Sequence, residues 1–258
     1  MALNKVFLCL IASAFLLNCQ KYDLLEKVEN PGGKVNASGS SCSGGAGIVK
    51  DGLVAFWNLN GNTNDKWDCG TGFQPGTPNS FSYVTDRFGV AGNAINLTSG
   101  VGLVNFGNLN QFQLSPFTVC AWIRLTAAAT TMPAVRKHDG TNGWRFQVRD
   151  VTSSADFGLQ GTYYVSTGTG MTVGNWYYVC MVVDTSLNPS IIGYVGLFNS
   201  TMQSSQYNAI AGMTGNTSNL ELNATGGTGG AVEFDDVAFY SRGLNSAEIQ
   251  QNYTASEQ

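Results

Sequence analysis

The stretch Phe117-Thr-Val-Cys-Ala-Trp-Ile-Arg-Leu125 decides the fold of this chain. It consists mainly of aromatic, β-branched and other apolar residues and contains neither glycine nor proline, which makes it the strongest strand signal in the sequence. Trp176-Tyr-Tyr-Val-Cys-Met-Val-Val183 is a second run of the same kind. Both runs are too short to span a membrane as helices, and we interpret them as strands.

On both sides of these runs, apolar and polar residues alternate in short segments separated by Gly, Asn, Asp, Ser and Thr. We predict strands at residues 53–59, 81–84, 94–97, 101–106, 117–125, 134–138, 143–149, 157–160, 163–167, 176–183, 191–199, 220–223 and 231–240. Because no helical pattern interrupts them, we expect an all-β fold with two antiparallel sheets packed face to face.

One short helix is predicted at the C-terminus. Asn245 is a good N-cap, and Glu248 stands three residues later, which is the spacing of a capping box. Leu244 before the cap and Ile249 in the first turn are spaced as a hydrophobic staple. Together these signals favour a helix over a solvated tail.

The composition limits the class of partner. The 258 residues are 43% hydrophobic and only 12% charged, which argues against a disordered chain and allows one large all-β domain or two smaller ones. Lys and Arg number 13 against 17 Asp and Glu, giving a net charge of −4. Because nucleic-acid binding needs a basic surface, we expect no nucleic-acid partner.

Residues 1–18 predict an export signal. Lys5 precedes the uncharged run Val6–Leu17, which is shorter than the ~20 residues of a membrane-spanning helix. Leu16-Leu17-Asn18-Cys19 resembles the lipobox of bacterial lipoproteins, although Asn18 is larger than the usual Gly, Ala or Ser. The resemblance implies that Cys19 carries lipid and anchors the protein in a membrane; the alternative is an ordinary signal peptide with Cys19 left free.

The residue after Cys19 is Gln20 rather than Asp, which the family's sorting pattern links to the outer membrane, with the domain facing the periplasm or the cell surface. Residues 19–49 are rich in Gly and Ser and lack apolar periodicity, so we expect a tether. Residues 50–258 are expected to form the folded domain.

Several segments of this domain resemble, in order, the LamG-like, concanavalin A-like jelly-roll domains. The segments are Gly52–Asp65, Thr85–Ile95, Phe117–Ile123, Asn175–Val179, Gly193–Val195 and Phe234–Ile249. The resemblance implies a two-sheet antiparallel jelly-roll sandwich of the lectin/glucanase type. It also implies carbohydrate or glycoprotein ligands, an inference by analogy of fold.

Four cysteines remain after the signal and the proposed anchor, and four cysteines allow three pairings. Export favours disulfides. Phe117-Thr-Val-Cys120 also resembles the pentraxin branch of the family, which implies a disulfide between Cys120 and Cys180 and leaves Cys42 and Cys69 as the second pair. Buried free thiols are the alternative for the pair in the strands.

Catalytic motifs are missing from the sequence. Glucanases of this fold carry Glu-x-Asp-x-x-Glu on one strand, and none of the six glutamates here has that spacing, although Glu221 and Glu233 could approach each other in space. The one histidine, His138, precedes Asp139-Gly140, a turn signal, and there is no G-x-S-x-G. We therefore expect a protein that is not an enzyme.

Calcium is one interpretation of a set of oxygen-bearing residues at positions where related domains bind the ion. The set is Asn62, Asn64, Asp65, Asp235 and Asp236. Hard cations need several oxygen ligands at once. The alternative is that these side chains satisfy turns through local hydrogen bonds, with Asp235 or Asp236 making an internal bond.

A ligand surface is predicted from the period of residues 143–149. Trp144, Phe146 and Val148 fall on one strand face, and Arg145, Gln147 and Arg149 fall on the other. The polar set could line an exposed face beside Tyr163 or Tyr164, and Trp67 in the Asn/Gly-rich loop is another candidate for an aromatic platform. Ordinary packing is the alternative for each residue.

These observations predict a lipid-anchored, non-catalytic binding protein of the cell envelope whose LamG-like domain binds a glycan or glycoprotein. Two alternatives stay open. One is a structural or protein-interaction lipoprotein without affinity for sugar, and the other is a divergent glycan-cleaving enzyme.

Overall fold

The computed structural model describes residues 45–67, 75–113, 115–127, 132–149, 154–159, 162–167, 171–208, 213–223 and 231–255, all within the compact unit Lys34–Gln258. The predicted signal, the predicted anchor Cys19 and the predicted pair of Cys42 with Cys69 lie outside these residues. The side chains of Arg149, Tyr163 and Tyr164 are likewise outside the described part, although their backbone lies in strands.

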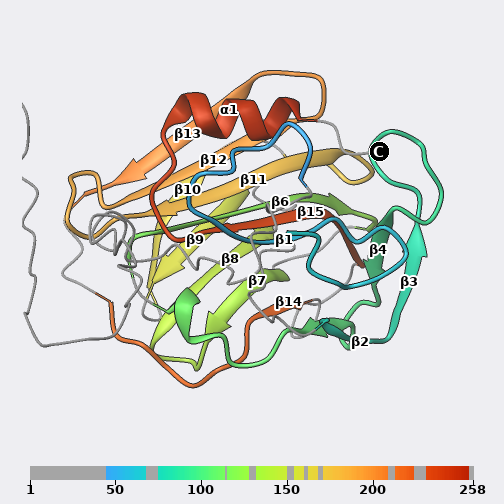
Figure 1. Cartoon of the computed structure of the whole chain (residues 1–258), viewed down its shortest axis with the longest axis horizontal. Coiled ribbons are helices and arrows are strands. Elements are labelled where there is room, and N and C mark those ends of the chain that lie inside the picture. The colour runs from blue at the N-terminus through green and yellow to red at the C-terminus, as the bar shows by residue number, and fades with distance from the viewer. Residues whose placement is uncertain are drawn as a thin grey trace, which may run out of the picture. The chain divides into compact units, whose positions relative to one another are not determined.

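Two antiparallel sheets make up the domain (Figure 1). The eight-stranded sheet has the order β13-β12-β11-β6-β15-β4-β3, with β1 paired to β15. Its strands are β1 (Leu53–Trp57), β3 (Phe81–Val84), β4 (Ala94–Leu97), β6 (Phe117–Leu125), β11 (Trp176–Val183), β12 (Ile191–Leu197), β13 (Met202–Tyr207) and β15 (Val232–Tyr240). The predicted all-β jelly-roll sandwich is confirmed.

The seven-stranded sheet has the order β10-β9-β8-β7-β14-β5-β2. Its strands are β2 (Thr77–Asn79), β5 (Leu103–Asn105), β7 (Met132–His138), β8 (Gly143–Arg149), β9 (Ser154–Leu159), β10 (Thr162–Thr167) and β14 (Glu221–Asn223). A 3₁₀ helix, η1 (Asn110–Phe112), follows β5, and α1 (Ser246–Thr254) ends the fold.

The main core fills the space between the sheets. In β8, Trp144, Phe146 and Val148 are fully buried in it, as the strand period predicts. From the other sheet, Val119 and Ile123 of β6 enter the same core. Burial of apolar area at roughly 25 cal/mol per Å² makes this core the principal source of stability.

A second core covers the outer face of the eight-stranded sheet. Cys120 and Trp122 point to this side of β6 and pack with Ile249 and Tyr253 of α1. Figure 1 shows α1 on the side of this sheet that faces away from β7, β8 and β14. Because both faces of β6 are buried, its sequence is a continuous apolar run rather than an alternating one.

The helix α1 begins as the sequence predicts. The Asn245 side chain accepts the Glu248 N–H, and the Glu248 carboxylate accepts the Asn245 N–H, so the capping box is complete. Leu244 and Ile249, the predicted staple, are both buried. At the far end of the helix, the Tyr253 hydroxyl donates to the carbonyl of Leu197 at 2.5 Å, which fixes α1 to the end of β12.

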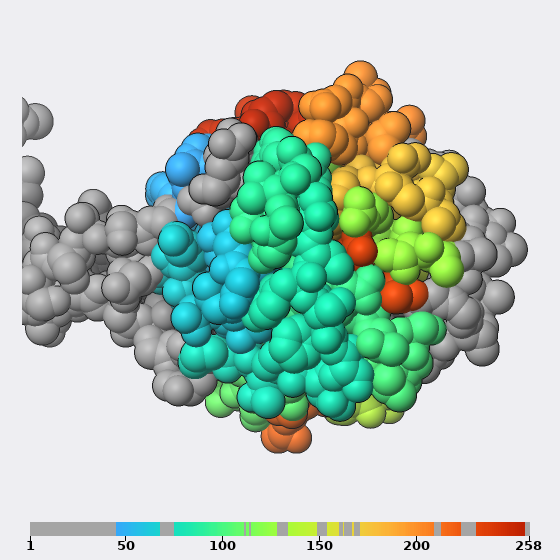
Figure 2. Space-filling model, turned by 90° about the vertical axis from the view of Figure 1, so that its right-hand side faces the viewer, coloured from blue at the N-terminus to red at the C-terminus, as the bar shows by residue number. Residues whose placement is uncertain are grey.

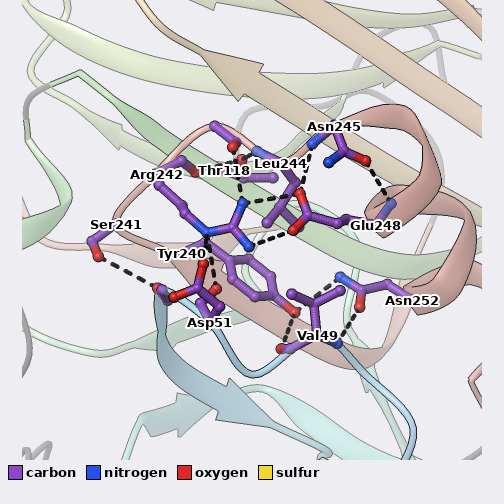
Figure 3. A network of polar contacts seen from close by, with 12 residues as sticks. Val49, Asp51, Thr118, Tyr240, Ser241, Arg242, Leu244, Asn245, Glu248 and Asn252 are labelled. Carbon is purple, nitrogen blue, oxygen red and sulfur yellow. Dashed lines mark hydrogen bonds and ion pairs between the residues drawn. The ribbon is translucent and has the colours of Figure 1, made fainter. Parts of the chain in front are cut away.

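The segment before β1 is held by the same helix. The Val49 N–H donates to Asn252 Oδ1 at 2.8 Å, and the Tyr240 hydroxyl donates to the Val49 carbonyl at 3.2 Å (Figure 3). Ile48 and Val49 are buried in the second core. The packed domain therefore already includes Ile48 and Val49, ahead of the expected start at residue 50.

Two strands, β2 and β13, are missing from the sequence prediction. Both lie at sheet edges. In β13, Gln203, Ser204 and Gln206 are exposed, so the segment lacks the apolar alternation from which a strand is predicted.

Figure 2 looks onto the end of the domain at the edge strand β3, where the teal part of the chain fills the centre of the view.

The disulfide implied for the central strands is present. Cys120 and Cys180 are directly opposite in the pairing of β6 with β11, with 4.1 Å between their Cα atoms. The chain-entropy model gives about 4 kcal/mol for closing a loop of this length. Among the described residues, no helix is long and apolar enough to cross a membrane.

Candidate functional site

The candidate site is the outer face of the seven-stranded sheet around β7 and β8, which we call the polar face. It is defined by Asn105, Arg136, His138, Arg145, Gln147, Asp156 and Glu221. Each of these residues alternates along its strand with residues of the main core, such as Val104, Val135, Trp144 and Leu222. The alternation therefore turns the polar side chains outward.

The strand register brings residues from four strands into one row across this face. Asn105 lies opposite Glu221, Glu221 opposite Arg136, and Arg136 opposite Arg145. The backbone continues the row to Gly158 and then to Tyr163. The structure thus places Arg145 and Tyr163 in the same row, whereas Tyr164 falls at the register shift beside it.

Two groups of polar contacts organise this face. Glu221 Oε2 accepts from Arg136 Nε at 2.9 Å, and the Arg136 side chain is 34% exposed. One row along, Gln147 Nε2 donates to Asp156 Oδ2 at 3.3 Å, and Ser154 Oγ donates to Asp156 Oδ1 at 3.1 Å. Gln147 and Asp156 are both buried, whereas Arg136 and Arg145 are half-buried. The two arginines are therefore more accessible than Gln147 and Asp156.

His138 lies on the polar face at the end of β7. Its Nδ1 accepts the Gly140 N–H at 3.0 Å, while Asp139 Oδ1 accepts the N–H groups of Thr141 and Asn142. These contacts build the turn that the sequence predicts. Burial lowers the pKa of His138, and the charges of the two arginines lower it further against the opposing effect of Asp139.

Trp67 is not an exposed platform, and this prediction is wrong. The residue is 7% exposed and belongs to the second core, and the Lys50 Nζ lies 5.0 Å from its ring centroid. Its backbone N–H donates to Asp65 Oδ1 at 3.0 Å, which turns the ring-bearing segment back toward β1. The asparagine- and glycine-rich loop here is therefore partly a core element.

The residues predicted to bind calcium are engaged by the protein itself. Asp65 Oδ1 accepts the Phe56 N–H at 2.9 Å, and Asn62 Oδ1 accepts the Asn64 N–H at 2.9 Å. Among the described residues, no group of three or more His, Cys, Asp or Glu side chains could hold a metal ion. The turn interpretation accounts for the contacts of Asn62 and Asp65, and calcium binding at these residues stays a prediction.

Asp235 and Asp236 both bind the side chain of Arg87, a residue that the sequence did not indicate as their partner. Arg87 Nη1 lies 2.5 Å from Asp235 Oδ2, and Nη2 lies 2.5 Å from Asp236 Oδ2. Asp236 has a φ of 46° at a β-bulge in β15, which turns it toward the same arginine. Burial, together with the neighbouring Asp236, raises the pKa of Asp235. Arg87 stands in a segment that resembles the family, but nothing in its spacing links it to β15.

Lys137 is a second buried cation that the sequence analysis missed. It is 0% exposed, its Nζ donates to Asn108 Oδ1 at 2.7 Å, and it also donates to the Ser218 carbonyl. Burial lowers the pKa of Lys137 to about 8. The alternation of side chains along β7 turns Lys137 inward, beside its pairing partner Trp144 and away from the polar face.

The structure separates Glu221 from Glu233. Glu221 belongs to the seven-stranded sheet and binds Arg136, whereas Glu233 belongs to the eight-stranded sheet and binds Arg124. Both alternate with main-core residues, so they lie on the two opposite outer faces of the sandwich. The pair therefore does not form the arrangement of two facing carboxylates that glycoside hydrolysis uses.

Solved structures with the same fold include toxin binding domains and a sialidase. The binding domain of Paraclostridial Mosquitocidal Protein 1 has a TM-score of 0.59 at 15% identity, covering 78% of this chain and 52% of that one. The Trypanosoma rangeli sialidase in complex with sialic acid has a TM-score of 0.57 at 16% identity, covering 83% of this chain and 35% of that one. The binding domain of botulinum neurotoxin DC, in complex with rat synaptotagmin II, has a TM-score of 0.55 at 11% identity, covering 78% and 51%.

This chain therefore spans about half or less of the length of these proteins, and at such identities the likeness concerns the fold alone. No curated protein matches the chain. The family described as the concanavalin A-like lectin/glucanases superfamily matches residues 98–250, which include both central strands, the polar face and the start of α1. The chain belongs to the concanavalin A-like lectin/glucanase superfamily.

Proposed function

We propose that this protein is a lipid-anchored binding protein of the cell envelope whose jelly-roll domain binds carbohydrate or glycoprotein ligands on the polar face without cleaving them. The observation that carries the proposal is the row formed by Asn105, Glu221, Arg136 and Arg145 across four strands. Sugar hydroxyls donate and accept hydrogen bonds, and planar amide, carboxylate and guanidinium groups on rigid strands suit them.

The second core covers the outer face of one sheet, which makes the polar face of the other sheet the candidate ligand surface. The outer face of the eight-stranded sheet is occupied by α1 and by Ile48 and Val49. The outer face of the other sheet carries half-buried charged side chains at Arg136 and Arg145. A ligand that binds a sheet face therefore has the polar face as its better surface.

The comparisons support a binding role in general terms. The neighbours include a domain solved with synaptotagmin II and a sialidase solved with sialic acid, so domains of this fold occur in proteins that bind proteins and in proteins that bind sugars. The sequence lacks the Glu-x-Asp-x-x-Glu motif of the glucanases, which is why our proposal leaves out catalysis.

The anchor is the second part of the proposal. Cys19 would carry the lipid, and residues 20–44 would lead to the packed segment that begins ahead of Ile48. Substituting Cys19→Ala should move the protein from the detergent phase to the aqueous phase in phase partitioning, because the acyl chains supply the membrane affinity. Unchanged recovery in the detergent phase would exclude Cys19 as the anchor.

A glycan array probed with the full-length protein in detergent tests the binding function. We expect binding to a defined set of glycans without release of reducing ends. Binding to envelope proteins alone would favour the structural lipoprotein, and release of reducing ends would favour the enzyme. Repeating the array with calcium and with EDTA tests calcium binding, which stays a prediction.

A further inference from the structure

The strand β3 forms one edge of the eight-stranded sheet. β4 pairs with one side of it, and among the described residues no strand pairs with the other side. Phe81 and Ser82 are exposed there, and Figure 2 looks directly onto this edge. An edge strand presents backbone N–H and C=O groups to which another strand can pair.

The pairing with β4 determines which backbone groups of β3 are left at the edge. The Thr98 N–H donates to the Ser80 carbonyl at 2.9 Å, in the register of this pairing. Hydrogen-bonded and non-hydrogen-bonded positions alternate along an antiparallel pair. Ser82 therefore bonds to β4, whereas the N–H and C=O groups of Phe81 and Tyr83 point away from the sheet.

The side chains at this edge are aromatic and uncharged. Phe81 and Tyr83 lie opposite Leu97 and Ile95 of the main core, so their rings are on the core-facing side of β3. The two rings meet edge to face with centroids 5.5 Å apart, and Phe81 is 39% exposed. Residues 77–84 contain no charged side chain, which is the feature that proteins commonly place on an edge strand to oppose pairing.

A second copy of β3 matches this edge in antiparallel register. When Ser82 lies opposite Ser82 of the second copy, Phe81 of each copy lies opposite Tyr83 of the other. These two pairs occupy the hydrogen-bonded positions, so four backbone N–H groups donate across the junction. Each aromatic ring gains a cross-strand aromatic neighbour, and the small serines meet on the opposite side of the sheet. Because residues 77–84 are uncharged, the pairing brings no like charges of these residues together.

We infer that the protein associates with a second copy of itself through β3, which joins the two eight-stranded sheets across a twofold axis at Ser82. Such an isologous contact closes on itself, because each copy contributes the same edge. β3 has only four residues, so we expect a reversible pair rather than a permanent one.

The inference is independent of the ligand proposed for the polar face. β7, β8 and β14 belong to the other sheet and take no part in the junction. The pair would therefore present two polar faces, and a ligand with repeated epitopes would bind it more tightly than it binds one copy.

Ser82→Cys tests the register directly. Residues opposite each other at a non-hydrogen-bonded position have Cα atoms about 4.5 Å apart, a distance that a disulfide spans. We expect the full-length variant in detergent to form a covalent dimer under mild oxidation, with the cross-link mapped to position 82 by mass spectrometry. Ser204→Cys, at an exposed serine of the other edge strand β13, is the matched control, and the wild-type protein gives the background from the native cysteines. Equal cross-linking of the two variants would overturn the inference.

Ser82→Lys tests the association without a cross-link. It places two ammonium groups directly opposite each other at the axis, whereas in a single copy the new side chain extends into solvent. In sedimentation of the full-length protein over a concentration series, we expect the dissociation constant of the dimer to increase at least about tenfold. Ser204→Lys should behave as wild type, and an unchanged unfolding midpoint shows that each variant is folded.

Wild-type protein that stays monomeric at every concentration, or a dimer that persists unchanged in Ser82→Lys, would contradict pairing through β3. Ser82→Lys should leave the affinity of one copy for a monovalent glycan unchanged. Loss of the dimer and loss of glycan binding are therefore separate outcomes, and either can fail without the other.

Discussion

Arg87 joins three parts of the domain through one side chain. Its guanidinium binds Asp235 and Asp236, lies 4.8 Å from the ring of Trp122, and reaches the carbonyl of Ala255 at 3.5 Å. The side chain is 1% exposed. Removing one member of a buried ionic group leaves the others charged, unpaired and out of water.

Arg87→Met should therefore destabilise the domain strongly. We expect a loss of about 3 kcal/mol or more in the free energy of unfolding, measured by urea denaturation. Arg136→Met, which removes an arginine with a 34% exposed side chain, should cost less than about 1 kcal/mol. Equal losses in the two variants would contradict the role assigned to Arg87.

Lys137 should make the stability of the domain depend on pH above about pH 8. Its folded pKa of about 8 is below the ordinary 10.5, so between these values the unfolded chain holds a proton that the native chain has lost. Stability should therefore rise from pH 8 to pH 10 relative to Lys137→Met, by at most roughly 3 kcal/mol. Parallel stability curves for the two proteins would show that the buried amine does not titrate in this window.

The element that closes the fold is α1 together with the segment before β1. Figure 3 shows Asn252 between the two, where its side chain accepts from Val49 and donates to the Tyr240 hydroxyl at 2.9 Å. On the same helix, Glu248 caps the N-terminus and binds Arg242. These contacts fix the ends of the domain to each other across the eight-stranded sheet.

Asn252→Ala should loosen this connection. It leaves the buried Val49 N–H without its acceptor, which costs about 1 to 3 kcal/mol. Hydrogen exchange at residues 45–52 should increase more than exchange in β6. The exposed Gln250→Ala on the same helix is the control, and a similar effect in both variants would contradict the role of Asn252.

At the scale of single strands and helices, the sequence predicts the features that depend only on the local spacing of residues. The period of β8 predicts that Arg145 and Gln147 share a face, and the spacing from Asn245 to Glu248 predicts the capping box. The opposition of Arg136 to Arg145 depends on the strand register, and the burial of Trp67 depends on the second core. Neither the opposition of the two arginines nor the burial of Trp67 can be predicted from the spacing of residues along the chain.

At the scale of the whole described domain, the two outer faces of the sandwich differ in chemistry. The outer face of the eight-stranded sheet holds α1 and Val49 in the second core and also the ion pair of Arg124 with Glu233, whereas the outer face of the other sheet carries Arg136, Arg145 and Glu221. The chain enters the domain on the first of these faces, next to α1 (Figure 3). A ligand on the polar face would therefore not compete with the segment through which the proposed tether joins the domain.

Hydrogen exchange of the full-length protein with and without a bound glycan tests the central claim, that the polar face is the ligand surface. We predict slower exchange in β7, β8 and β14 and unchanged exchange in α1, because the sugar would cover the row that contains Arg136 and Arg145. Protection confined to α1 and β13, with β7 and β8 unchanged at saturating glycan, would contradict the account.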